Sequence, residues 1–275
     1  MNTFAKKIQY FSFAILLFLS CNKKNKESKP TGANSQNPIE VHNNYYLDSN
    51  ESYIIRVNYP SDSRDKDSLI ANLVMSNVRV YQEEWKIGGE EYLYSKELKL
   101  EHPDYSYLPY EYGVNYTTVK STKLGYTTYK CIEYDYTGGA HPNSYAINFT
   151  FDDNKYVRLA QVLDTSYSNM LALSNMLAYE LVAQNGDRIN EEFMQEGLGL
   201  KYLRTDGTFD KEEALDKDFT FASNFEVFTI QDVGIVFTMQ QYQVAPYSSG
   251  MPEALLPWTV LKPYLNKEFI KRNNL

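Results

Sequence analysis

Few side chains in this sequence could do chemistry, and the most informative of them is His141. It lies in the segment Tyr134–Tyr145, which reads Tyr-Asp-Tyr-Thr-Gly-Gly-Ala-His-Pro-Asn-Ser-Tyr. A metal site needs three or four converging ligands, but His42 and His102 are remote in sequence and no His-x-x-x-His or Cys-x-x-Cys spacing occurs. We therefore expect a turn histidine bonded to nearby backbone, with ligand binding as the alternative and no metal or cofactor.

Cys131 is the second candidate, as a nucleophile. It stands in an alternating run, where the side chain of Lys130 faces the other way. A thiol nucleophile also needs a positioned base, and His141 is only a remote candidate. The sequence therefore predicts a buried, inert thiol at Cys131.

Carboxylates form the third group. Glu133 and Asp135 share one face of a predicted strand, and Asp152 and Asp153 cap a turn. Two acids held about 5 to 10 Å apart in a cleft can cleave glycosides. Acids are in surplus in this chain, so two acids often lie close together by coincidence. We therefore expect these side chains to be solvated and predict no catalytic residue. A cell-wall hydrolase that uses an acid pair is the enzyme alternative.

Tyrosine is unusually frequent, with 25 copies. The segment from Tyr105 to Tyr112 holds four of them, and exposed tyrosines there could stack on sugars or anchor a protein interface. Packing against a sheet edge is the alternative. Tyr247, followed by Ser-Ser-Gly, indicates a structural turn first and a contact loop second. The candidate binding residues are therefore His141, Asn143, Tyr107, Tyr110 and Tyr247.

These residues lie on a predicted series of strands and helices. Apolar residues from Leu69 to Trp85 recur at three- and four-residue spacing, which predicts a helix opened by Asp65 or Asp67. Residues 83–108 fit neither period, so we expect irregular or partly helical structure there. Further helices are predicted at 170–185, 191–200 and 258–269. Alternation predicts strands at 53–59, 112–118, 126–136, 145–151 and 156–159, and a hairpin of 225–230 and 235–242 around residues 231–234.

The turn signals set the connections. Gly138 and Gly139 supply the positive φ angles of a tight connection within an antiparallel meander, and Asn185-Gly186 ends a helix. The order of elements predicts an α+β fold, with antiparallel meander sheets, helices packed on one side, and two adjoining or intertwined α/β lobes. The lobes are expected at 45–154 and 155–275.

The N-terminus indicates export. Lys6 and Lys7 precede an apolar run from Phe11 to Leu19 that is shorter than the roughly 20 residues needed to span a bilayer. Residues 18–21, Phe-Leu-Ser-Cys, are similar to the bacterial lipobox, so we expect a lipoprotein signal peptide at 1–20 and a lipid on Cys21. An uncleaved anchor helix is the alternative. Residues 21–44 are expected to hold the lipidated cysteine and a flexible tether.

Charge limits the class of partner. The chain has a formal net charge of −8, and removal of Lys6 and Lys7 with the signal peptide makes it −10. Such a chain is not expected to bind nucleic acid and favours basic partners. Once Cys21 is lipidated, Cys131 is the only cysteine left, so no intramolecular disulfide is expected.

Two segments together carry a family resemblance. Tyr134–Asn143 and Tyr242–Gly250, the latter shortly before a Pro-Trp helix start, resemble the RsiV/PdaC-like extracellular family over residues 53–265. The family includes the outer domain of a lysozyme-sensing anti-sigma factor and the non-catalytic N-terminal part of a peptidoglycan deacetylase. Since only a signal peptide and tether precede the shared part and nothing follows it, we expect neither the anti-sigma role nor deacetylation.

The resemblance implies a sensing or binding domain in the cell envelope. The sequence therefore predicts a lipid-anchored, non-catalytic envelope protein that binds a lysozyme-type muramidase, with peptidoglycan glycan binding as an alternative. Residues 22–26, Asn-Lys-Lys-Asn-Lys, lack an acidic surface-export cluster, which favours a bacterial lipoprotein facing the periplasm. The natural ligand, the membrane and the oligomeric state stay open.

Overall fold

The computed structural model describes residues 43–50, 52–61, 64–87, 97, 101, 109–202, 204 and 220–275. These residues lie in one compact unit, 41–275. Within them, no helix combines the length and apolar character needed to cross a bilayer. The predicted signal peptide, Cys21 and the segment around Tyr107 fall outside the described residues, so the expectations for them stay predictions.

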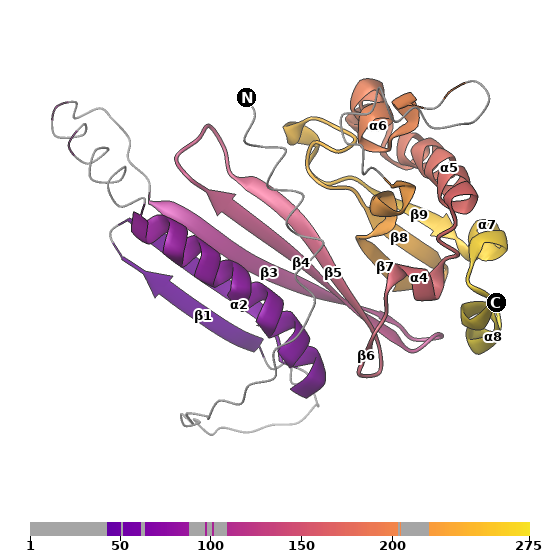
Figure 1. The fold of residues 1–275 in the computed structure, drawn as a ribbon, viewed down its shortest axis with the longest axis horizontal. Coiled ribbons are helices and arrows are strands. Elements are labelled where there is room, and N and C mark those ends of the chain that lie inside the picture. The colour runs from indigo at the N-terminus through magenta and orange to yellow at the C-terminus, as the bar shows by residue number, and fades with distance from the viewer. Residues whose placement is uncertain are drawn as a thin grey trace, which may run out of the picture. The chain divides into compact units, whose positions relative to one another are not determined.

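A six-stranded sheet carries the N-terminal half, in the order β1-β2-β3-β4-β5-β6 (Figure 1). Its neighbouring strands are antiparallel except β2 and β3, which are parallel and separated in sequence by helix α2 (Arg64–Ile87). The predicted meander is confirmed as β3, β4 and β5, whereas β1 and the parallel pair were not predicted. The strands are β1 (Asn43–Ser49), β2 (Tyr53–Pro60), β3 (Tyr110–Ser121), β4 (Tyr126–Tyr136), β5 (Asn143–Asp152) and β6 (Lys155–Tyr156).

Helix α2 covers one face of this sheet, as its apolar spacing predicts. Ile70, Val74 and Val78 are fully or almost fully buried and pack in one core with Val57 and Tyr112 of the sheet. Each large apolar side chain buried in this way contributes about 1.5–3 kcal/mol to stability. The helix begins at Arg64, so Asp65 and Asp67 lie inside it rather than at its start.

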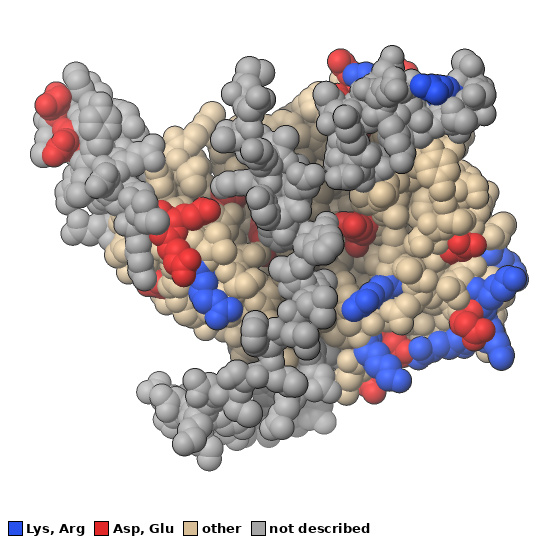
Figure 2. All heavy atoms as spheres, viewed as in Figure 1, with Lys and Arg blue, Asp and Glu red and all other residues tan. Residues whose placement is uncertain are grey.

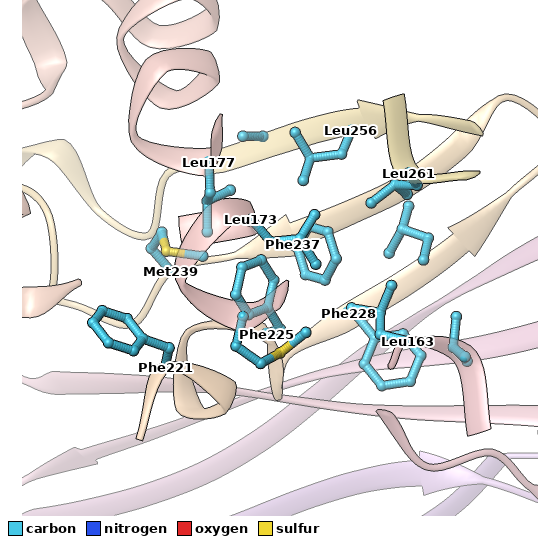
Figure 3. Close-up of a cluster of buried hydrophobic side chains, with 14 of the residues drawn as sticks. Leu163, Leu173, Leu177, Phe221, Phe225, Phe228, Phe237, Met239, Leu256 and Leu261 are labelled. Atoms are coloured by element: carbon cyan, nitrogen blue, oxygen red, sulfur yellow. The ribbon is translucent and has the colours of Figure 1, made fainter. Parts of the chain in front are cut away.

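A second core forms around a three-stranded antiparallel sheet (Figure 3). The rings of Phe225 and Phe237 meet edge to face at 4.9 Å, and Leu173 and Leu177 of α5 are fully buried beside them. Gly186, with φ of 58°, ends α5 as predicted. The strands are β7 (Phe228–Gln231), β8 (Gly234–Thr238) and β9 (Glu253–Pro257), and the helices are α4 (Leu159–Val162), α5 (Tyr167–Asn185), α6 (Glu191–Gly197), α7 (Trp258–Leu261) and α8 (Lys267–Asn273).

Several predicted boundaries were wrong. The short strand ends at Tyr156, and Leu159, predicted to be its last residue, instead begins α4. The second hairpin arm ends at Thr238 rather than Tyr242. The helix predicted over 258–269 is interrupted by a short 3₁₀ turn that contains Pro263, whose nitrogen has no hydrogen to donate. Short 3₁₀ turns also occur at 186–188, 200–202, 221–225 and 247–249.

The second sheet packs on the face of the large sheet opposite α2. Strand β7 contacts β3, β4 and β5, and the side-chain amide of Asn148 donates to the Phe228 carbonyl at 3.3 Å and to the Thr229 hydroxyl at 3.1 Å. A hydrogen bond between Thr128 and Thr150 lies in the same buried contact. The α+β class is confirmed, and the division at residues 154 and 155 stays a prediction.

Candidate binding site

The connection between β4 and β5 holds His141. Gly138 has φ of 84°, a conformation that favours glycine, whereas Gly139 does not have a positive φ. The expectation that both glycines supply positive φ angles is therefore correct only for Gly138. His141 is exposed, and its Nδ1 lies 3.2 Å from the Pro142 carbonyl oxygen, the backbone contact that the sequence predicts.

Two glutamines after β8 fasten a second loop to this connection. The side chain of Gln240 pairs with the backbone of Ala146 in β5, accepting from its N–H at 2.9 Å and donating to its carbonyl at 2.8 Å. Gln241 accepts from the Ser144 N–H at 3.0 Å. This glutamine clamp, made by Gln240 and Gln241, occupies backbone groups at the open edge of β5 and fixes the loop beside His141.

The loop brings two tyrosines to the histidine. The rings of His141 and Tyr247 stack with centroids 3.7 Å apart and planes 22° apart. The Tyr242 hydroxyl lies 3.2 Å from His141 Nε2, and its ring centroid is 6.1 Å from that of Tyr247. Tyr242 has φ of 65°, which is unusual for a bulky residue and marks a constrained position. We call His141, Tyr242 and Tyr247 the aromatic cluster.

Helix α6 supports the loop from behind. A Cβ atom at Gly197 would stand 1.7 Å from the carbonyl oxygen of Gln243, so only glycine allows this approach. The Gln243 amide donates back to the Gly197 carbonyl at 3.3 Å. The Ser249 hydroxyl donates to the Arg188 carbonyl at 2.8 Å, which holds the 3₁₀ turn that carries Tyr247. The aromatic cluster is thus held from both sides.

The structure joins the two sequence segments that carry the family resemblance. His141 belongs to the first and Tyr247 to the second, and their stack was not predicted. Tyr242 was missed as a candidate, although it is the first residue of the second segment. The signal that could have found it is its place in that segment.

Other candidates lie elsewhere. Tyr110 packs edge-on against Trp85 in the first core, at 5.6 Å between ring centroids, so it belongs to the core under α2. The Asn143 amide donates at 3.5 Å to Asp135, which with Glu133 forms the acid pair of β4. The aromatic cluster therefore includes His141 and Tyr247 of the predicted set, but not Tyr110 or Asn143.

One of the two acids, Glu133, is not solvated as predicted. Glu133 is only 4% exposed, and both of its oxygens accept from the amide of Asn77 in α2, at 3.0 and 3.2 Å. Burial raises the pKa of the Glu133 carboxyl most, the hydrogen bonds from Asn77 oppose this rise, and the Asp135 charge adds to it. The expectation fails for Glu133 because α2, which covers this face, comes from a distant part of the chain.

Two further expectations concern cysteine and metal. Cys131 is buried, as predicted, and burial raises the pKa of its thiol to about 12. Over the ranges that the structure describes, no three His, Cys, Asp or Glu side chains come close enough together to hold a metal ion.

The aromatic cluster offers stacking faces, an imidazole and phenol hydroxyls, which are groups suited to binding.

Two solved structures resemble this fold. One is a member of the DUF3298 family from Bacteroides fragilis, with 18% identity and a TM-score of 0.54 over 85% of this chain and 97% of that one. The other is a DUF3298 family protein from Pseudomonas aeruginosa, with 13% identity and a TM-score of 0.53 over 84% of this chain and 94% of that one. At these identities the likeness shows the fold alone.

Two family models match separate parts of the chain. Residues 47–144 match the model described as deacetylase PdaC, and residues 172–259 match the model described as a protein of unknown function, DUF3298. No curated protein matches the chain. The N-terminal part is therefore similar to the PdaC model and the C-terminal part to DUF3298, which confirms the PdaC-like resemblance seen in the sequence.

Proposed function

We propose that this protein is a lipid-anchored, non-catalytic binding protein of the bacterial cell envelope, facing the periplasm. Its aromatic cluster engages a basic protein, of which a lysozyme-type muramidase is the first candidate. The lipid is attached to Cys21. One observation supports the proposal most directly: two distant segments converge on one exposed set of rings.

Exposure and rigidity favour a contact role for the aromatic cluster. Tyr242 is 42% exposed, His141 is exposed and Tyr247 is half-buried, so their rings reach solvent. Backbone and side-chain bonds hold both loops in place, which lowers the conformational entropy that binding would otherwise cost. Tyrosine is also enriched among the residues that dominate binding energy.

Charge favours a basic partner. A chain with net charge −10 after cleavage attracts a basic protein over about a Debye length and speeds association. The attraction is uneven, because basic side chains gather at the lower right of Figure 2, where Figure 1 places α8 with Lys267, Lys271 and Arg272. A basic partner is therefore expected to bind away from α8.

The burial of Glu133 favours binding over hydrolysis. A hydrolase would need two carboxyls open to a cleft, whereas Glu133 lies beneath α2 and is bonded to Asn77. Zymography on purified cell wall tests this part of the proposal. Clearing of the wall by the purified protein would contradict it.

Binding is tested with the fragment 41–275, which forms a compact unit by itself. Titration calorimetry with lysozyme is expected to give micromolar affinity that weakens from 25 to 300 mM salt. His141→Ala and Tyr247→Ala are each expected to weaken binding about thirtyfold, which corresponds to the roughly 2 kcal/mol that defines an interface hot spot. Tyr179→Ala, which removes a 74% exposed tyrosine from α5, is the control. An absence of salt-sensitive binding would sink the proposal.

The anchor is tested in cells. Cys21→Ser is expected to move the protein from the membrane to the soluble fraction and to abolish labelling by a radioactive fatty acid. Cys131→Ser, at the buried thiol, is the control and keeps both properties. Unchanged membrane retention and labelling in Cys21→Ser would refute lipidation at this residue.

A further inference from the structure

The large sheet carries a flat aromatic ring on the face opposite α2. Tyr134 of β4 lies directly across from Gly113 of β3. A Cβ atom at Gly113 would stand 2.0, 2.5 and 2.8 Å from three atoms of the Tyr134 ring. The ring therefore occupies the space above the Gly113 backbone and lies against the sheet, with its outer face directed away from it. Tyr134 is half-buried, so part of that face reaches solvent.

A pair of amides lies next to this ring. Asn115 follows Gly113 by two residues and so stands on the same face of β3. The Asn58 amide nitrogen donates to the Asn115 side-chain oxygen at 3.1 Å. This bond leaves an acceptor on Asn58 and a donor on Asn115, the complementary pair that a sugar hydroxyl or an acetamido group uses.

A cavity of about 230 Å³ begins at Asn115. It is smaller than the roughly 300–1,000 Å³ of sites for drug-sized ligands, which suits one sugar ring. Lys130 and Glu253 form an ion pair in its wall, and the Thr238 hydroxyl donates to Glu253 at 2.7 Å. Ile132 and Met251 supply apolar wall.

The spacing of these features matches a short chain rather than a single ring. Tyr134, Ile132 and Lys130 occupy successive positions on one face of β4, so Tyr134 and Lys130 are about 14 Å apart at 3.4 Å per residue. A ligand that stacks on Tyr134 and also reaches Lys130 must consist of at least two linked rings.

We propose that this face binds a short, uncharged oligosaccharide of N-acetylated amino sugars. One sugar ring stacks on Tyr134, since aromatic faces attract the weakly positive C–H groups of a pyranose. The next ring enters the cavity, where Ile132 and Met251 contact the acetamido methyl group. Because Lys130 and Glu253 neutralise one another, the cavity supplies a donor and an acceptor without net charge and favours a neutral ligand.

The site is independent of the aromatic cluster and of the proposed protein partner. It lies on β3, β4 and the residues near the start of β9, and shares no residue with His141, Tyr242 or Tyr247. A basic protein and a saccharide can therefore be tested separately on the same fragment.

The test is calorimetric titration of fragment 41–275 with N-acetylglucosamine oligomers of two to five units. Millimolar or tighter binding is expected, with little dependence on salt. Tyr134→Leu and the exposed Asn115→Ala are each expected to weaken it at least tenfold. Gly113→Ala keeps the tyrosine but displaces its ring, so an equal loss is expected. His141→Ala is the control and leaves saccharide binding unchanged, while melting temperatures confirm that each variant is folded.

Two further ligands identify the chemistry and its source. Glucosamine oligomers, which lack the acetyl groups, are expected to bind at least tenfold more weakly, and equal binding would overturn the acetamido assignment. Purified peptidoglycan is expected to retain the wild-type fragment but not Tyr134→Leu, if the wall is the source of the ligand. Absence of oligomer binding, or binding that none of the three variants weakens, would overturn the proposal.

Discussion

Removing the charge of Glu133 should stabilise the variant relative to the wild type, and this gain should grow as the pH rises from acid to neutral. Its carboxylate is 4% exposed and is bonded to the Asn77 amide. Burial is the largest influence on this group and raises its pKa above the ordinary 4.5. Glu133→Gln keeps the shape of the side chain and one acceptor for Asn77, but removes the buried charge.

The sign follows from proton linkage. A carboxyl whose pKa is higher in the folded state takes up its proton there first, so the cost of burying the charge is absent below pH 4.5. As the pH rises through the folded pKa, that cost develops and the free energy of unfolding falls. For one proton the slope is at most about 1.4 kcal/mol per pH unit. Glu133→Gln lacks this slope and carries instead a constant loss of about 1 kcal/mol for a weakened bond to Asn77.

The assay is urea unfolding of both proteins from pH 4 to 8, followed through the fluorescence of tryptophan, including the buried Trp85. The difference between variant and wild type is expected to shift in favour of the variant as pH rises, then level off. Glu196→Gln removes an exposed carboxylate from α6 and controls for the change in net charge. A difference that stays constant with pH, or that shifts against Glu133→Gln, would refute the reasoning.

Three further perturbations are predicted. Gly197→Ala should lower the free energy of unfolding by about 2 kcal/mol in urea titration, because its Cβ meets the Gln243 carbonyl, and should also weaken binding at the aromatic cluster. Gly139→Ala, with its nearest atom at 3.9 Å, is the matched control. Phe237→Ala should cost about 3–5 kcal/mol in the same assay, since the ring is fully buried against Phe225, and a loss under 1 kcal/mol would contradict the packing. Asp232 accepts hydrogen bonds from Ser121, Thr122 and the Lys123 backbone, which lower the pKa of its carboxyl, the Ser121 bond most. The stability that it contributes is therefore present above pH 3.8 and lost as pH falls through the lowered pKa, so Asp232→Asn should lower the melting temperature at pH 7 more than at pH 2.5; equal effects would argue against it.

Local patterns predicted much of the fold. The apolar stripe of α2, the alternation of β4 and the end of α5 at Gly186 each depend on residues close in sequence. Strand β1 was missed because its short sequence carries little alternation beyond Tyr45 and Leu47. Its structure depends on pairing with β2, which the local sequence does not show. Gly234 was expected to serve the hairpin turn, but it has no positive φ and instead allows close approach of Leu256 in β9.

The candidate site was predicted only in part, because its contacts join distant residues. His141 and Tyr242 are 101 positions apart in sequence, and Glu133 and its partner Asn77 are 56 apart. The hydrophobic periodicity of a sequence cannot predict contacts between such distant residues. The occurrence of both motifs in one chain suggested that the two segments act together. Which tyrosines lie beside His141, namely Tyr242 and Tyr247 and not Tyr110, depends on tertiary packing.

The glutamine clamp has a consequence for folding cooperativity. Gln240 and Gln241 follow β8 of the small sheet, yet their amides satisfy backbone groups of Ala146 and Ser144 in the large one. If the small sheet came loose alone, the β5 edge would be left as a bare template for pairing with another chain. The two sheets are therefore expected to melt in a single transition, which protects the protein from aggregating through a half-opened state.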